Sequence, residues 1–295
     1  MANLALGDQE FTASNGLNFT YSVRGEPYSI HPVILVQCPG WGIGAQYLKA
    51  GLEPLEVKFT LVYFHPRGTC GSSRPENRTH MNVFHMAEDL EHFRQHLQLD
   101  KYPVMLGHSN GGTIVLAYAE MYPHRVEKLV LIDHRLLGFD DSDGFQRFLL
   151  QRKVDVRYEA AYGTAANFRP ENDEELRRFV EMTSPIYFFD PEKNVPLYLH
   201  SLGTGPMEFW CFESLQLCNK DPETGGRLIE GLPKVMAKTL MIFGRDDAQC
   251  TVDNLHQTAK EIPHAQIVIL DQCGHFPWLE KPTETFDALE RFLTA

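Results

Sequence analysis

The sequence predicts an α/β fold: a mostly parallel central sheet with flanking helices and an inserted helical cap. Three observations support this expectation. The apolar run 103–106 leads into a helical stretch at 112–122, as expected for a strand followed by a helix that packs on it. Two more strands are expected at 238–243 and 266–270, each ending in a polar loop. The chain lacks strand-helix alternation between the strand at 129–132 and the strand at 238–243.

The remaining elements follow from apolar periodicity. Strands are expected at 19–23, 33–37 and 59–64. A following helix has apolar residues along one face, namely Val83, Met86, Leu90, Phe93 and Leu97. The last helix is expected to start at Pro282, because proline suits a first helical position. Residues 1–133 and 238–295 are therefore predicted to form the core domain, and 134–237 the helical cap, with a helix starting at Asn172.

Ser109 is the candidate nucleophile. It lies in Gly107-His108-Ser109-Asn110-Gly111, at the predicted turn from strand to helix. Glycines on both sides remove the β carbons that would collide in so tight a turn. The helix that begins behind the serine directs free N–H groups toward any negative charge that develops there, and the N–H of Asn110 is the first such donor.

A nucleophilic serine needs a base, and the base needs an acid to orient it. Asp246 and Asp247 follow the strand at 238–243, and His275 follows the strand at 266–270. Active sites of open parallel sheets collect at the carboxyl ends of the strands, so Ser109, Asp247 and His275 are expected to converge there. Their order along the chain, Ser-Asp-His, is one of three that reach the same triad geometry.

These segments resemble the α/β-hydrolase family, and the resemblance covers nearly the whole chain. Residues 107–111 match the family's nucleophile elbow, 244–247 its acid loop, and 274–282 its histidine loop. Residues 64–75 are similar to the D-x-R-G-x-G-x-S segment of the proline iminopeptidase branch, with His65 in place of the aspartate. The resemblance implies a capped serine hydrolase in which Asp247 is the acid and Asp246 an exposed or loop-capping carboxylate.

Two site assignments depend on neighbouring loops. The second oxyanion donor is expected in the loop after the strand at 33–37, and we assign it to the N–H of Trp41, although Pro39 replaces the family's usual histidine. Asp133 ends the strand at 129–132 and is the alternative acid, because some family members take their acid from that strand. Alternatively, Asp133 caps the turn through which the chain leaves the sheet.

The cap is rich in aromatic residues, some of which are expected to line an apolar substrate pocket. Phe209-Trp210-Cys211-Phe212-Glu213 resembles a proline iminopeptidase segment whose glutamate binds the substrate's free amino group. The resemblance assigns that role to Glu213, with Trp210 and Phe212 beside it. The alternative is a glutamate on a helix surface.

Composition restricts the function classes. The net charge of -12 over 295 residues argues against nucleic acid as a partner and gives no basic amphipathic surface for membranes. No segment has the length of a signal peptide or a membrane span, which indicates a cytoplasmic location. The six cysteines lack paired spacing and are expected to be reduced. His92 and His96 have the spacing of a zinc site without a nearby third ligand, so no metal is expected.

The sequence therefore predicts a serine hydrolase that needs no cofactor and acts on a small molecule. An esterase or lactonase acting on an apolar substrate is the first expectation, and a prolyl aminopeptidase the second. A non-hydrolytic ligand receptor or helper protein on the same fold is the contrasting hypothesis. The oligomeric state is left open, with a homodimer as one option.

Overall fold

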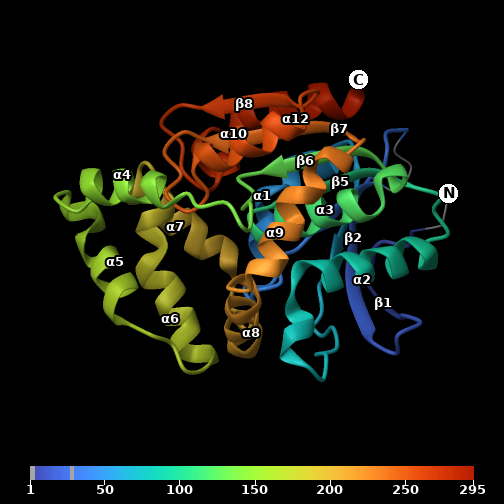
Figure 1. Ribbon diagram of the computed structural model, residues 1–295, viewed down its shortest axis with the longest axis horizontal. Coiled ribbons are helices and arrows are strands. Elements are labelled where there is room, and N and C mark those ends of the chain that lie inside the picture. The colour runs from blue at the N-terminus through green and yellow to red at the C-terminus, as the bar shows by residue number, and fades with distance from the viewer. Residues whose placement is uncertain (1–3, 27–29) are drawn as a thin grey trace.

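An eight-stranded sheet organises the molecule (Figure 1). The computed structural model describes residues 4–26 and 30–295. The strand order is β1-β2-β4-β3-β5-β6-β7-β8, with β1 and β2 antiparallel to their neighbours and all other pairs parallel. The bounds are β1 Gly7–Thr12, β2 Asn18–Gly25, β3 Ile34–Gln37, β4 Thr60–Phe64, β5 Tyr102–His108, β6 Val126–Ile132, β7 Lys238–Gly244 and β8 Gln266–Leu270.

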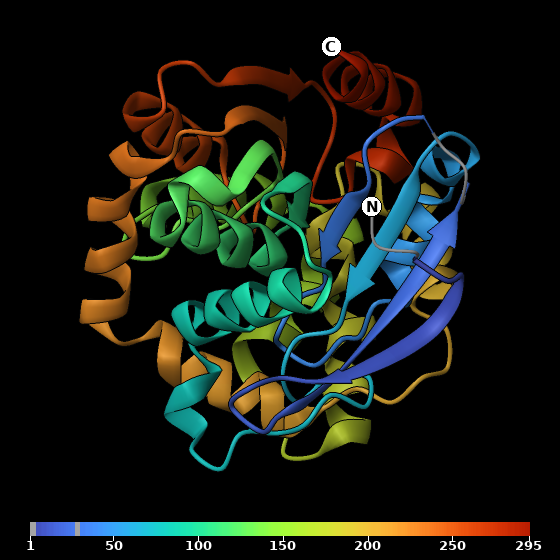
Figure 2. The same cartoon turned by 90° about the vertical axis from the view of Figure 1, so that its right-hand side faces the viewer.

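Helices cover both faces of this sheet (Figure 2). Alternate residues of a central strand point to opposite faces, so Met105 of β5 packs in one core and Val104 and Leu106 pack in the other. The first core includes residues of α2 (Val83–His96), α3 (Asn110–Met121) and α10 (Val252–Glu261). The second includes residues of α1 (Gln46–Gly51), α11 (Pro277–Glu280) and α12 (Pro282–Thr294). This arrangement confirms the expected mostly parallel sheet with flanking helices.

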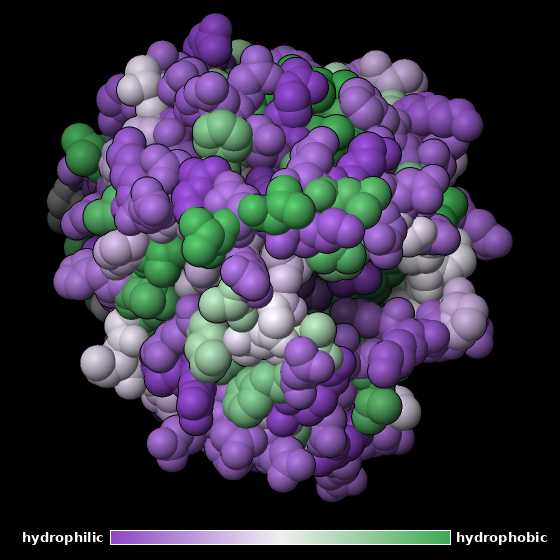
Figure 3. All heavy atoms as spheres, turned by 90° about the vertical axis from the view of Figure 1, so that its left-hand side faces the viewer, coloured by the Kyte–Doolittle hydropathy of each residue, from purple (hydrophilic) through white to green (hydrophobic). Residues whose placement is uncertain are grey.

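Only helices and loops occur between β6 and β7, and this whole stretch is described. Their bounds are α4 Ser142–Arg152, α5 Val156–Asn167, α6 Asp173–Thr183, α7 Pro191–Leu202, α8 Phe209–Asn219 and α9 Pro222–Gly231. In Figure 1, α4 to α7 lie to the left of the sheet, while α9 packs against α3 of the core. Figure 3 faces that left-hand side, where apolar side chains interrupt a polar surface; Leu150, Val154 and Val156 of the α4–α5 region are exposed.

The ends of the predicted strands and helices agree with the structure to within two residues, except that β6 begins at Val126, three residues before its predicted start at 129. Two further differences concern β1 and the start of α6. Strand β1 was not predicted, because its sequence is largely polar and it pairs only with β2 at the sheet edge. The start of α6 is capped as expected, since Asn172 Oδ1 accepts the Glu175 N–H at 2.9 Å. The Glu175 carboxylate, however, accepts the N–H of Glu171 rather than that of Asn172.

Candidate active site

Ser109 occupies the sharp turn between β5 and α3. Its backbone has φ +54° and ψ -122°, a left-handed conformation that L-residues rarely adopt. A β carbon on Gly107 would lie 2.4 Å from the carbonyl oxygen of Gly111, so the turn leaves no room for a side chain there. The strained turn places Ser109 at the amino end of α3, where unpaired backbone N–H groups gather.

His275 and Asp247 form a buried acid-base pair. Nδ1 of His275 lies 2.7 Å from Oδ2 of Asp247, and the two side chains are 6% and 0% exposed. The other carboxylate oxygen of Asp247 accepts the N–H of Gln249 at 2.7 Å, which fixes the orientation of the carboxylate. Because Nδ1 carries the proton that is donated to Asp247, Nε2 is left with a lone pair that can accept a proton.

Asp133 and Asp246 do not hydrogen-bond His275. Asp133 is fully buried at the end of β6, and its Oδ1 accepts the N–H of Gly244 at 2.9 Å. Burial, and next the negative charge of Asp247, raise the pKa of Asp133 well above its usual range. Asp246 lies in the neighbouring loop, where its backbone oxygen accepts a hydrogen bond from Arg152 at 2.7 Å. The geometry therefore favours Asp247 over both other carboxylates as the partner of His275.

Asn110 connects the two loops that were predicted to supply oxyanion donors. It is the first residue of α3, so its N–H has no acceptor within the helix. Its side-chain oxygen accepts the N–H of Gly40 at 2.8 Å, which holds the loop after β3. Trp41 follows in that loop and lines the same cavity as Ser109. Asn110 thus anchors a loop in which Pro39 has replaced the family's usual histidine.

Two supporting residues were not identified from the sequence. His108 contacts the backbone oxygen of His275 through Nε2 at 2.7 Å and the Tyr47 hydroxyl through Nδ1 at 3.1 Å. Burial, and next the charge of His275, lower the pKa of His108 well below its usual range. Glu280 accepts the N–H groups of Gly274 at 2.5 Å and Phe189 at 3.0 Å, which ties the histidine loop to the cap. The groups that the His108 and Glu280 side chains contact become visible only in the fold.

Ser109 and His275 line a cavity of about 300 Å³ between the core and the cap. Its wall is mainly aromatic and aliphatic, and Phe212 belongs to it. Glu213 and Trp210 do not line it. The Glu213 carboxylate forms an ion pair with Arg78 and is half exposed, and Trp210 packs beneath the guanidinium groups of Arg74 and Arg78. The structure thus separates these two residues from Phe212, although all three belong to one aromatic segment.

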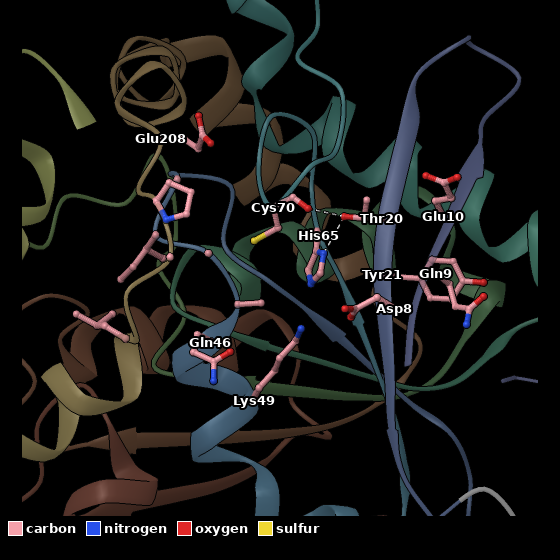
Figure 4. A pocket seen from close by; sticks show the side chains of 17 residues that line it. Asp8, Gln9, Glu10, Thr20, Tyr21, Gln46, Lys49, His65, Cys70 and Glu208 are labelled. Carbon is pink, nitrogen blue, oxygen red and sulfur yellow. Dashed lines mark hydrogen bonds between the residues drawn. The ribbon is translucent and has the colours of Figure 1, made fainter. Parts of the chain in front are cut away.

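His65 lines a different cavity, of about 680 Å³, between β1, β2 and the loop before α1 (Figure 4). The Thr20 hydroxyl donates to the Cys70 backbone oxygen at 2.8 Å, so it accepts from Nδ1 of His65 at 2.9 Å. The pKa of His65 is lowered to about 4, mainly because the ring is buried. The ring is therefore neutral near pH 7. The replacement of aspartate by His65 therefore lies outside the cavity of Ser109.

The structure describes all of the residues considered for metals and disulfides. His92 lies 3.1 Å from the Ser14 hydroxyl through Nδ1, whereas His96 stacks on Phe11, so the two rings have different partners. All six cysteines are free thiols, as expected for reduced residues. The one group of potential metal ligands in the described ranges is Asp247, Cys250 and His275, which uses the atoms of the acid-base pair. Within those ranges, every helix is too short or too polar to cross a membrane.

Comparison with known proteins supports the fold described above. The family model described as "alpha/beta hydrolase fold" matches residues 33–282. Monoacylglycerol lipase ABHD6 of Mus musculus is 24% identical over 278 residues, covering 94% of this chain and 80% of the relative. Proline iminopeptidase PfmaB of Pestalotiopsis fici is also 24% identical, over 284 residues, covering 92% of this chain and 94% of the relative.

A solved structure shows the same fold. The esterase RhEst1 from Rhodococcus sp. ECU1013 superposes with a TM-score of 0.70 at 19% identity, covering 98% of this chain and 99% of the esterase. The family match covers most of the chain and includes the segments of Ser109, Asp247 and His275. The chain therefore belongs to the alpha/beta hydrolase family.

Proposed function

We propose that the protein is a serine hydrolase that cleaves esters of small, largely apolar molecules. The observation that supports this most strongly is the 2.7 Å contact between His275 and Asp247 in a cavity that Ser109 also lines. Similarity to a monoacylglycerol lipase and an esterase supports the same chemistry. The mechanism also applies to lactones and amides, which contain the same electrophilic carbonyl.

In the proposed reaction, His275 removes the proton of Ser109 as the serine oxygen attacks the carbonyl carbon. The N–H groups of Trp41 and Asn110 stabilise the oxyanion. His275 then protonates the leaving alcohol, and water hydrolyses the acyl-enzyme with His275 again acting as base. Asp247 orients the imidazole and stabilises the imidazolium that forms twice in the cycle.

The cavity wall favours an ester over an N-terminal prolyl peptide. No aspartate or glutamate lines this cavity among the described residues, so it lacks a carboxylate that would pair with a free ammonium group. Glu213, the residue suggested for that task, is paired with Arg78 instead. Similarity to a proline iminopeptidase keeps the aminopeptidase as the second candidate.

A comparison of substrates distinguishes the two candidates. We expect the wild type to hydrolyse p-nitrophenyl esters of short fatty acids and to leave proline p-nitroanilide largely unchanged. Glu213→Gln should keep ester kcat/KM within about twofold, because it removes only a half-exposed ion pair. An enzyme that prefers the prolyl substrate, and loses about tenfold or more on it alone in Glu213→Gln, would instead be an aminopeptidase.

A further inference from the structure

Among the described residues that line the cavity of Ser109, Arg135 is the one with a permanently charged side chain. Apart from Arg135, His108 and His275, the described residues of this wall have no basic or carboxylate side chain. Arg135 follows β6 by three positions, and its backbone oxygen accepts the Thr113 hydroxyl at 2.7 Å. Thr113 belongs to the first turn of α3, so the backbone at Arg135 is held beside the helix that starts at Ser109.

The guanidinium of Arg135 has no hydrogen bond or ion pair with any residue that the structure describes. Ten of the sixteen arginines in this acid-rich chain have carboxylate partners among the described residues, whereas Arg135 shares the lack of one with Arg152, Arg169, Arg178, Arg227 and Arg291. The chain has 39 acidic residues against 27 basic ones, yet none of the 39 pairs with this cation at the cavity. Arg135 is exposed, so its five N–H donors are hydrated in the free protein and available to a ligand at the cavity.

Arg135 lines the same cavity as Ser109 and His275. Cys250 lines the same cavity, and its thiol lies within 4.8 Å of the ligand atoms of Asp247 and His275. Burial, and next the charge of Asp247, raise the pKa of Cys250, while the positive charge of Arg135 opposes that rise. The cation and the reacting groups therefore belong to the wall of one cavity.

We propose that Arg135 forms an anion subsite and that the substrates include esters carrying a carboxylate, such as the half-esters of dicarboxylic acids. A planar guanidinium binds a carboxylate through two parallel hydrogen bonds, which would orient the substrate while its ester carbonyl faces Ser109. The subsite rests on the proposed hydrolase function. Water is the co-reactant: the acyl carbon bonds to Ser109, the alcohol leaves with a proton, and water releases the dicarboxylic acid.

A matched pair of esters tests the subsite. p-Nitrophenyl hexanoate and p-nitrophenyl hydrogen adipate have acyl chains of equal length and differ in a terminal methyl or carboxylate. We expect Arg135→Gln to lower kcat/KM for the adipate about tenfold or more, and to leave the hexanoate within about twofold, because only the adipate loses a charge-assisted hydrogen bond. Arg135→Lys should retain part of the adipate activity, since it keeps the charge without the paired donors.

Arg178→Gln is the matched control, because Arg178 is an exposed arginine of α6 that does not line the cavity. It removes the same charge and should leave both esters within about twofold of wild type. Spontaneous hydrolysis is subtracted using Ser109→Ala. An equal loss on both esters in Arg135→Gln, or no loss on the adipate, would overturn the anion subsite alone. A wild type that hydrolyses neither ester would overturn the hydrolase itself, and the subsite with it.

Discussion

Asp247→Asn should lower ester kcat by at least about a hundredfold, with a melting temperature within about 3 °C of wild type. Asparagine keeps the shape of the side chain but removes the charge that stabilises the imidazolium. It can also present its N–H₂ group to Nδ1 of His275 and so favour the wrong tautomer. The related change in serine proteases lowers kcat about 10⁴-fold, which sets the scale. Steady-state kinetics measures kcat, and thermal unfolding of the same preparation measures the melting temperature.

Asp133→Asn is the matched control, because both acids are buried at the ends of adjacent strands. Burial and the charge of Asp247 raise the pKa of Asp133 and so favour its neutral form, which a neutral amide of the same shape resembles. We expect its kcat to stay within about tenfold of wild type. If Asp133→Asn abolishes turnover and Asp247→Asn is mild, the acid follows β6 and our assignment is wrong.

Gly111→Ala should destabilise the protein by about 3 kcal/mol or more, or prevent soluble folding. Gly111 lies in the first turn of α3, and a β carbon there would meet the backbone oxygen of Gln37 at 2.3 Å. That atom belongs to the end of β3 and cannot rotate away as a flexible side chain could. Relief would push α3 from the sheet and move the loop that contains Trp41. Urea unfolding measures the loss.

Gly163→Ala provides the comparison for this effect. Gly163 lies within α5 and is exposed, and a β carbon on it would meet nothing within 4 Å. The same substitution should therefore stabilise the protein by about 0.5 to 1 kcal/mol, because alanine loses less backbone entropy in a helix. If Gly111→Ala proves as harmless as Gly163→Ala, the contact between α3 and β3 does not constrain the site as described.

Periodicity and turn chemistry were sufficient to predict most of the fold. The glycines around Ser109 and the apolar run before it correctly indicated a strand, a strained turn and a helix. The positions of Asp247 and His275 after two later strands correctly placed both side chains at one edge of the sheet. These features are local, or follow from the rule that parallel strands end on the same side, so no tertiary contact had to be known.

The remaining features depend on contacts between distant segments. The spacing within residues 209–213 could not show that Phe212 faces the cavity while Glu213 turns toward Arg78, because the partner lies 135 positions away. The link from His108 to the His275 loop crosses 167 positions. Arg135 gave no motif at all, and its position in the cavity became visible only from the arrangement of β6, α3 and the cap.

Covalent labelling tests the central claim that Ser109 is an activated nucleophile. A fluorophosphonate reacts with a serine whose oxygen is deprotonated by a neighbouring base and whose developing charge is stabilised. The account predicts one adduct, mapped by mass spectrometry to the peptide containing Ser109, and none in Ser109→Ala. Labelling that persists in Ser109→Ala, or an adduct on another residue in the wild type, would contradict it.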